Sequence, residues 1–281
     1  MTFEVMAVVL FSALLHAGWN ALVRASDDKF LSTLHVVGGA GTLAALLLPA
    51  LPLPALASWP WLLASALVHV LYFVLVARAY SGADLSFAYP LMRGTAPVLT
   101  ALCAAALMGE MLAPGGWLGV ALISTGVLAL AWQAWRHSAA HQPAAVAAAL
   151  VNAAVIALYT LVDGQGVRLS GHALAYTGWV FLLTALGLLA WGLLRRGRAV
   201  LRPTPGRWRA ALLGGGGTLA AYSLTLWAMA QAPIALVAAL RETSIVFGAL
   251  LGWLFLKEHI ARGRYLAIGL ICAGAVGIRL G

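Results

Sequence analysis

Four charged residues stand inside long apolar stretches of this sequence: Arg93, Asp163, Arg241 and Glu242. A charged side chain at the centre of a bilayer costs about 2.5–3.5 kcal/mol on insertion scales, so each of these groups needs a partner or water. The fork of donors on a guanidinium suits a carboxylate, which it can bind through two parallel hydrogen bonds. The two arginines could therefore hold the anionic end of a ligand, or they could bond backbone carbonyls between helices.

The two carboxylates allow several roles. Glu242 directly follows Arg241, although neighbours on a helix point in different directions and need not share a face. Glu242 could pair with either arginine, including its neighbour, or it could carry a coupling proton. Asp163 is expected to end its helix on a stripe with Asn152 and Tyr159, facing the bundle interior. Its alternative role is that of an interfacial residue that caps the following turn.

Aromatic and polar side chains recur at helical spacing around these charges. Such side chains can line a pocket that holds an apolar body and a polar head, but they also serve as hydrogen-bonding contacts between helices. The candidate binding residues are His16, Trp19, Asn20, His69, Tyr72, Tyr89, Arg93, Tyr159, Asp163, Tyr222, Trp227, Arg241 and Glu242. The sequence predicts no catalytic residue, no metal site and no cofactor, because Cys103 and Cys272 match no metal-ligand spacing.

The composition indicates that lipid surrounds most of the chain. Of 281 residues, 63% are hydrophobic and only 9% are charged, against about 25% charged in a soluble domain. This excludes a cytosolic enzyme, a disordered chain and a disulfide scaffold. At about 20 residues for each spanning helix, the apolar runs predict an all-α polytopic membrane protein with ten spans, at 3–24, 31–50, 60–82, 84–107, 113–135, 144–163, 172–194, 208–230, 233–256 and 262–280.

The basic residues predict how these spans are oriented. Of the 17 Lys and Arg residues, 13 fall in the connections after odd-numbered spans and 2 on the other side. The positive-inside rule then predicts a multi-pass protein of a bacterial-type inner membrane with both termini in the periplasm. The net charge of +9 reflects this orientation and not a nucleic-acid partner. The first apolar stretch lacks a basic leading segment, so it is expected to remain as a helix and not to be cleaved as a signal peptide.

A shift of the sequence by 148 residues shows an internal repeat. It places Arg93 on Arg241 and Glu110 on Glu258, and it also matches several Thr, Val, Leu and Gly positions. Each copy would contain five helices, at 1–140 and 141–281. Because five is odd, the two copies would insert in opposite directions. Inverted repeats of this kind are typical of secondary transporters, whose substrate site lies near mid-membrane between the halves.

The chain resembles the drug/metabolite transporter superfamily, in its ten-helix branch with two EamA-type repeats. The resemblance rests on the segments His16–Ala21 and Tyr159–Gly164 and on the Gly109-Glu110 break that closes the fourth helix. Phe255–Glu258 resembles this break in the second copy, with Lys257 in place of the usual glycine. Among members of the superfamily, amino acid exporters of the YddG type are the nearest analogy.

The resemblance implies a non-enzymatic exporter of small amphipathic metabolites, with neutral or aromatic amino acids as the first candidates. It would work as a monomer in the bilayer by alternating access around a central cavity lined by helices 1, 3, 4, 6, 8 and 9. One alternative is a proton-coupled multidrug exporter, for which Glu242 is the candidate proton carrier. Another is a membrane-embedded enzyme acting on a lipid-linked substrate, although no acidic or histidine cluster marks such a site.

The basic imbalance generates a test of topology. Alkaline phosphatase fused after Gly281 should be active, because it would be exported, and the same enzyme fused within the Arg195–Arg209 connection should be inactive. Phosphatase activity in whole cells measures this directly. The opposite pattern of activities would reverse the predicted orientation.

Overall fold

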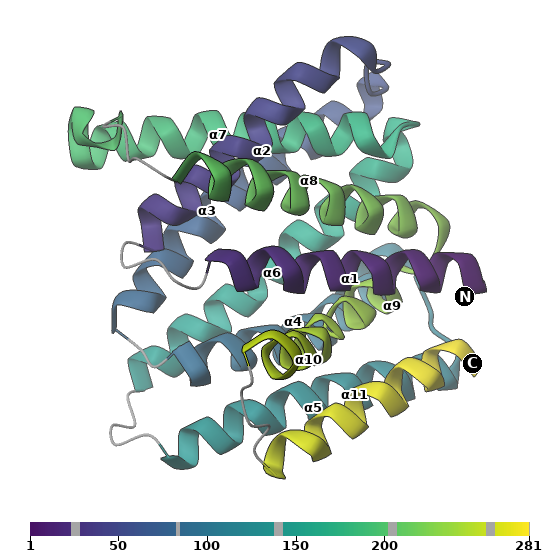
Figure 1. Ribbon diagram of the computed structural model, residues 1–281. Coiled ribbons are helices and arrows are strands. Elements are labelled where there is room, and N and C mark those ends of the chain that lie inside the picture. Colours follow the sequence, from purple (N-terminus) through teal and green to yellow (C-terminus); the bar gives the residue numbers. More distant parts are fainter. Residues whose placement is uncertain (24–28, 83–84, 138–142, 202–206, 257–261, 281) are drawn as a thin grey trace.

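The computed structural model describes residues 1–23, 29–82, 85–137, 143–201, 207–256 and 262–280. Throughout these residues the regular secondary structure is helical (Figure 1). The α-helices are α1 (Phe3–Val23), α2 (Lys29–Leu47), α3 (Trp59–Gly82), α4 (Leu85–Met108), α5 (Pro114–His137), α6 (Pro143–Ser170), α7 (Ala173–Arg196), α8 (Arg207–Gln231), α9 (Ile234–Arg241), α10 (Ser244–Leu256) and α11 (Arg262–Leu280). Three short 3-10 helices, η1 (Leu48–Ala50), η2 (Leu56–Ser58) and η3 (Gly197–Leu201), lie in the connections.

The predicted all-α membrane fold is confirmed. Within the described residues, nine helical segments are long and apolar enough to cross a membrane, and one of them joins α9 and α10 as Ile234–Leu254. The helix outside this group is α8, which has 25 residues. Its composition explains this, because α8 contains arginines at its start and the four glycines Gly214–Gly217. Each predicted span thus corresponds to a helix, with two differences.

The first difference is in the ninth span. The sequence predicts one continuous helix over 233–256, whereas α9 ends at Arg241 and α10 begins at Ser244. Glu242 follows α9 as its C-cap, and its backbone N–H bonds back to the carbonyls of Ala239 and Leu240. The break has no proline or glycine, so hydropathy did not reveal it. It leaves Arg241 and Glu242 at the interruption of a helix within the membrane.

The second difference is in the sixth span. The sequence places its end at Asp163, but α6 continues for two more turns, to Ser170. Asp163 is therefore an interior helical residue with no exposed surface. Gly171, with φ of 74°, ends α6, and the His172 imidazole accepts a hydrogen bond from the Ala175 N–H at 3.2 Å to begin α7. A glycine with positive φ is a common end for a helix.

Glycines bring several helices into backbone contact. α5 and α11 pack along each other, and a Cβ at Gly274 would lie 2.7 Å from the carbonyl oxygen of Gly119. A second close pair joins α2 to α8, where a Cβ at Gly39 would overlap the backbone of Ala211. Small residues at helix contacts are typical of membrane bundles, because association there relies on close packing.

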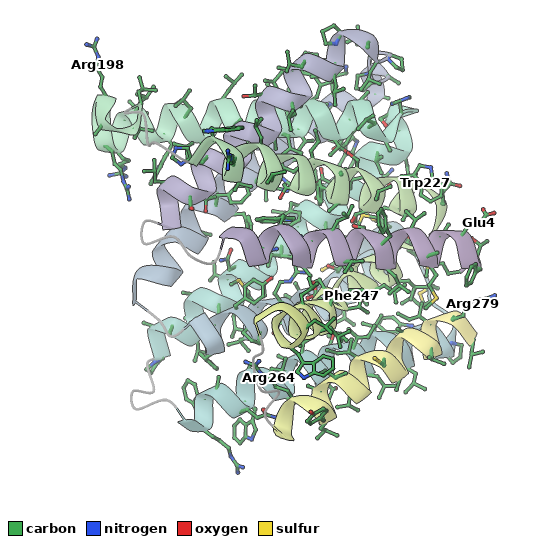
Figure 2. The ribbon with its side chains drawn as sticks, viewed as in Figure 1. Glu4, Arg198, Trp227, Phe247, Arg264 and Arg279 are labelled. Carbon is green, nitrogen blue, oxygen red and sulfur yellow. The ribbon has the colours of Figure 1, made fainter. Side chains whose placement is uncertain are left out.

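The chain ends lie together. Figure 1 shows the N- and C-termini at one end of the bundle, and η3 lies at the opposite end, where Figure 2 labels Arg198. The side chains of Arg195 and Arg209, near this second end, lie over the rings of Trp191 and Trp208, at 6.0 and 5.2 Å. The turn from α8 into α9 lies at the same end as the termini (Figure 1).

The contact between α5 and α11 predicts opposite effects for two glycines of α11. Gly274→Ala should destabilise the protein by about 1–3 kcal/mol, the usual cost of overpacking, because its Cβ meets the backbone of Gly119. Gly269→Ala is the matched control, since no atom lies within 4 Å of its Cβ. It should gain up to about 1 kcal/mol from helix propensity. Thermal unfolding in detergent measures both, and equal shifts would contradict the contact.

Candidate functional site

A buried ion pair joins the two halves of the chain. Arg93 of α4 donates through Nε to Glu242 Oε2 at 2.9 Å, and both side chains are 5% exposed. The two residues are 149 apart in sequence. Glu242 thus pairs with the distant arginine and not with its neighbour Arg241, which settles the question that its position in sequence left open. The pair supplies the counter-charge that each group needs in lipid.

The Arg93 guanidinium is only partly satisfied by this pair. Its Nη2 is buried without a hydrogen-bond partner among the described residues. Its Cζ also lies 6.0 Å from the centre of the Tyr89 ring, one turn earlier on α4. A buried donor without a partner is costly, so it marks a place where a ligand oxygen or a water would be favourable.

Arg241 is the least neutralised charge of the site. Its Cζ lies 5.2 Å from the centre of the Tyr222 ring, an arrangement that allows a cation–π contact. It is half-buried, and within the described part of the chain it has no ion pair or hydrogen bond from its side chain. The two arginines that the predicted repeat aligns therefore differ, because Arg93 has an ion pair and Arg241 has none within the described ranges.

Asp163 is bound by two tyrosines. Its carboxylate accepts hydrogen bonds from Tyr222 Oη at 2.5 Å and from Tyr176 Oη at 3.2 Å. Gly166 leaves room for the Tyr176 ring, since a Cβ there would overlap the phenol. Tyr222 thus touches Asp163 with its hydroxyl and Arg241 with its ring. These contacts place Asp163 in the interior, as expected, and exclude the alternative of an interfacial cap.

Aromatic rings form a continuous group beside these charges. His69 stacks at 4.4 Å from Tyr159, and Tyr159 meets Tyr72 at 5.5 Å, measured between ring centres. His69 also meets Tyr222 edge-on at 5.7 Å, and Phe181 meets Tyr222 at 5.9 Å. Offset and edge-on pairs of this kind are favourable. We call these residues the aromatic group: His69, Tyr72, Tyr159, Phe181 and Tyr222.

Helix α1 contributes fewer available polar groups to the site than the helical spacing of His16, Trp19 and Asn20 predicts. The His16 ring lies edge-on to Trp19 at 5.3 Å and is within electrostatic range of Arg93 and Arg241. Trp19 Nε1 is buried and has no hydrogen-bond partner in the part of the chain that the structure describes, so it is a second unsatisfied donor. Asn20 Nδ2, in contrast, donates to the His16 carbonyl of its own helix at 2.8 Å. Its amide is therefore partly used within α1.

Two residues of this neighbourhood were missed by the sequence analysis, and one prediction is not brought into it. Tyr176 and Phe181 belong to α7, a helix that the sequence did not assign to the cavity. In the sequence, the only indication of such a role was a tyrosine, followed five residues later by a phenylalanine, within an apolar run. Trp227, in contrast, is 38% exposed and lies toward the far end of α8 (Figure 2).

These contacts assemble most of the predicted residues into one site of α1, α3, α4, α6, α8 and α9. Tyr159, within the aromatic group, lies in electrostatic range of both arginines, Glu242 and Asp163. No set of three His, Cys, Asp or Glu side chains that could hold a metal occurs among the described residues. Among the described residues, the site offers two unsatisfied donors and one arginine without an ion pair, next to aromatic faces. Such an arrangement can bind an anionic group with an apolar or aromatic body.

Three comparisons with known proteins indicate which proteins this chain resembles. Residues 143–280 match the EamA-like transporter family. No curated protein matches the chain significantly. One solved structure, described only as "Crystal structure of protein", shares 20% sequence identity with a TM-score of 0.74, over 99% of this chain and 96% of the other. At that identity the likeness shows the fold alone. The second half of the chain, residues 143–280, is thus similar to the EamA-like transporter family of the drug/metabolite transporter superfamily.

Proposed function

We propose that this protein exports small amphipathic metabolites across a bacterial-type inner membrane, with neutral and aromatic amino acids as first candidates. The observation that carries the proposal is Arg241, a half-buried cation without a counter-ion among the described residues, next to Tyr222 of the aromatic group. A substrate carboxylate would supply the missing negative charge. Because such a bond forms in a place shielded from water, it is stronger than the same bond in solution.

The remaining groups of the site suit the other parts of an amino acid. The aromatic group offers ring faces to an apolar or aromatic side chain, and the Asp163 oxygens keep lone pairs that could accept from an ammonium. Trp19 Nε1 and Arg93 Nη2 are further unsatisfied donors for a carboxylate oxygen. In this proposal all the sequence-predicted site residues except Trp227 lie close to the substrate.

The mechanism we propose is alternating access between two inverted five-helix repeats, 1–140 and 141–281. If α1 corresponds to α6 and α3 to α8, each contact in one half should have a counterpart. α1 packs on α8 and α6 packs on α3, while α4 packs on α6 and α1 packs on α9 and α10. This pairing supports equivalent halves. One half would rock against the other around the site, as in other inverted-repeat transporters.

A second candidate is a proton-coupled multidrug exporter, and the observation that favours it is Glu242. This carboxylate is buried near the broken helix and bonded to Arg93, so its protonation would release that arginine. Transport by proteoliposomes with and without a pH gradient separates the two candidates. Strict dependence on the gradient would favour the proton-coupled exporter. Equal transport in both conditions would favour facilitated export.

The proposal predicts a selective effect of Arg241→Gln. Loss of a hydrogen bond to a charged group costs about 1.5–3 kcal/mol, which is roughly 10- to 150-fold in affinity. Transport of amino acids should fall by this factor, and transport of their amides should fall much less, because amides lack the carboxylate. Proteoliposome transport assays measure both, with Arg279→Gln as a control at the end of α11 (Figure 2). Equal losses for acids and amides would show that Arg241 holds helices together.

The ion pair predicts a rescue experiment. Arg93→Gln or Glu242→Gln alone leaves a buried charge without its partner, which destabilises a protein by about 3–5 kcal/mol. Each single variant should therefore reach the membrane poorly. The exchange Arg93→Glu with Glu242→Arg restores opposite charges at the two positions and should recover folded protein, measured as the monodisperse fraction by fluorescence-detected size exclusion. A double variant no better than the singles would contradict an essential pair.

A further inference from the structure

A second ion pair, outside the site, ties three connections together at one end of the bundle. Arg168, in the last turn of α6, donates through Nη2 to Glu110 Oε1 at 2.6 Å. The same guanidinium donates to the carbonyls of Met229 through Nε and of Ala232 through Nη2, both at 2.9 Å. A single side chain thus joins the end of α6, the end of α8 and the connection between α4 and α5.

Glu110 extends this network to the helix that carries Arg241. Its second oxygen, Oε2, accepts the backbone N–H of Ile234, the first residue of α9, at 2.8 Å. The N-cap of α9 is Pro233, whose side chain makes no capping bond. A helix start leaves N–H groups unsatisfied and favours a negative charge. Glu110 therefore supplies from another element the cap that α9 lacks.

α9 is a short helix with a hydrogen bond or an ion pair to another element at each end. It has 8 residues, about 12 Å at 1.5 Å for each residue, and Ile234 to Leu240 are buried. Between α9 and α10 the backbone bonds tighten to i→i−3 pairs, from the Glu242 N–H to the Ala239 carbonyl and from the Thr243 N–H to the Leu240 carbonyl, both at 3.0 Å. The Glu110–Arg168 pair holds the first residue, and the Arg93–Glu242 pair holds the residue just after the last. Arg241, the last residue of α9, lies between these two bonded positions.

We propose that Glu110 and Arg168 are positioning residues, which place Arg241 opposite Tyr222 by fixing the start of α9. This inference rests on the proposed function, in which Arg241 binds the substrate carboxylate. The pair is more exposed than the central one, at 15% for Glu110 and 30% for Arg168. It lies where α8 turns into α9, the end of the bundle at which the termini lie (Figure 1).

An ion pair that only stabilised the bundle would behave differently from one that positions Arg241. Loss of a merely stabilising pair would reduce folded protein and the transport of every substrate alike. A positioning pair acts through Arg241, so its loss would weaken the recognition of the carboxylate and have no effect where Arg241 is already absent. Coupling of two sites through one shared element appears as non-additivity in a double-mutant cycle.

The test combines transport with hydrogen exchange. In Glu110→Gln, the KM for an amino acid should rise about 2- to 10-fold, the usual value of one hydrogen bond. The KM for the corresponding amide and both kcat values should change little. In the Arg241→Gln background the same substitution should have no further effect. The matched control is Glu4→Gln, an exposed carboxylate in the first turn of α1 at the same end (Figure 2), which should behave as the wild type.

Backbone hydrogen exchange of residues 234–241 tests the same inference without any substrate. Exchange should be faster in Glu110→Gln than in the wild type, and unchanged in Glu4→Gln. Unchanged exchange in Glu110→Gln, or additive effects with Arg241→Gln, would overturn the positioning role. If Arg241→Gln fails to distinguish acids from amides, the proposed function fails, and exchange still decides whether Glu110 fixes α9. Should Glu110→Gln not fold, Arg168→Lys, which retains the charge but not the planar fork, is tested by the same two measurements.

Discussion

A guanidinium in the interior of a bilayer needs an opposite charge close by, and the described structure is organised around this need. The Arg93 side chain is 5% exposed, and its ionic partner among the described residues, Glu242, comes from the second half of the chain. Glu242 can take this position because α9 ends there and the chain turns before α10 begins. This pair links the two halves of the chain at the interruption of the ninth span, directly beside Arg241. A continuous helix would direct Glu242 and Arg241 differently.

The pair also explains why two arginines at equivalent places in the sequence have different roles. Each half contributes one arginine, and Glu242 forms its ion pair with Arg93. Arg241 instead lies against the ring of Tyr222, whose hydroxyl donates to the Asp163 carboxylate. Sequence equivalence thus becomes chemical asymmetry. A site in which one arginine is ion-paired, while the other has no ion pair among the described residues, has a defined polarity that a ligand of one orientation can match.

The sequence was sufficient for the fold because each spanning segment satisfies its own backbone in lipid. Length and hydropathy therefore located the helices without information about the neighbouring helices. These two signals were wrong where a helix end depends on contacts with other helices. The charge of Asp163 suggested the end of a helix, but α6 extends past it because Tyr222 and Tyr176 donate hydrogen bonds to its carboxylate. The same limit applies to the site. His69, Tyr159 and Tyr222 were accessible as polar rings in apolar runs, whereas Phe181 and Arg168 acquire their roles from partners on other helices.

The glycines of α8 have a consequence for how the protein is made. Gly214–Gly217 let α8 approach α2 so closely that a Cβ at Gly215 would lie 2.7 Å from the backbone carbon of Gly39. The same glycines give α8 too little apolar side chain to enter lipid strongly by itself. α8 therefore depends on helices that were inserted earlier, and α1 and α2, against which it packs, are synthesised first. Membrane insertion of this helix is then a docking step, and its efficiency is set by the surface of α2 as much as by the composition of α8.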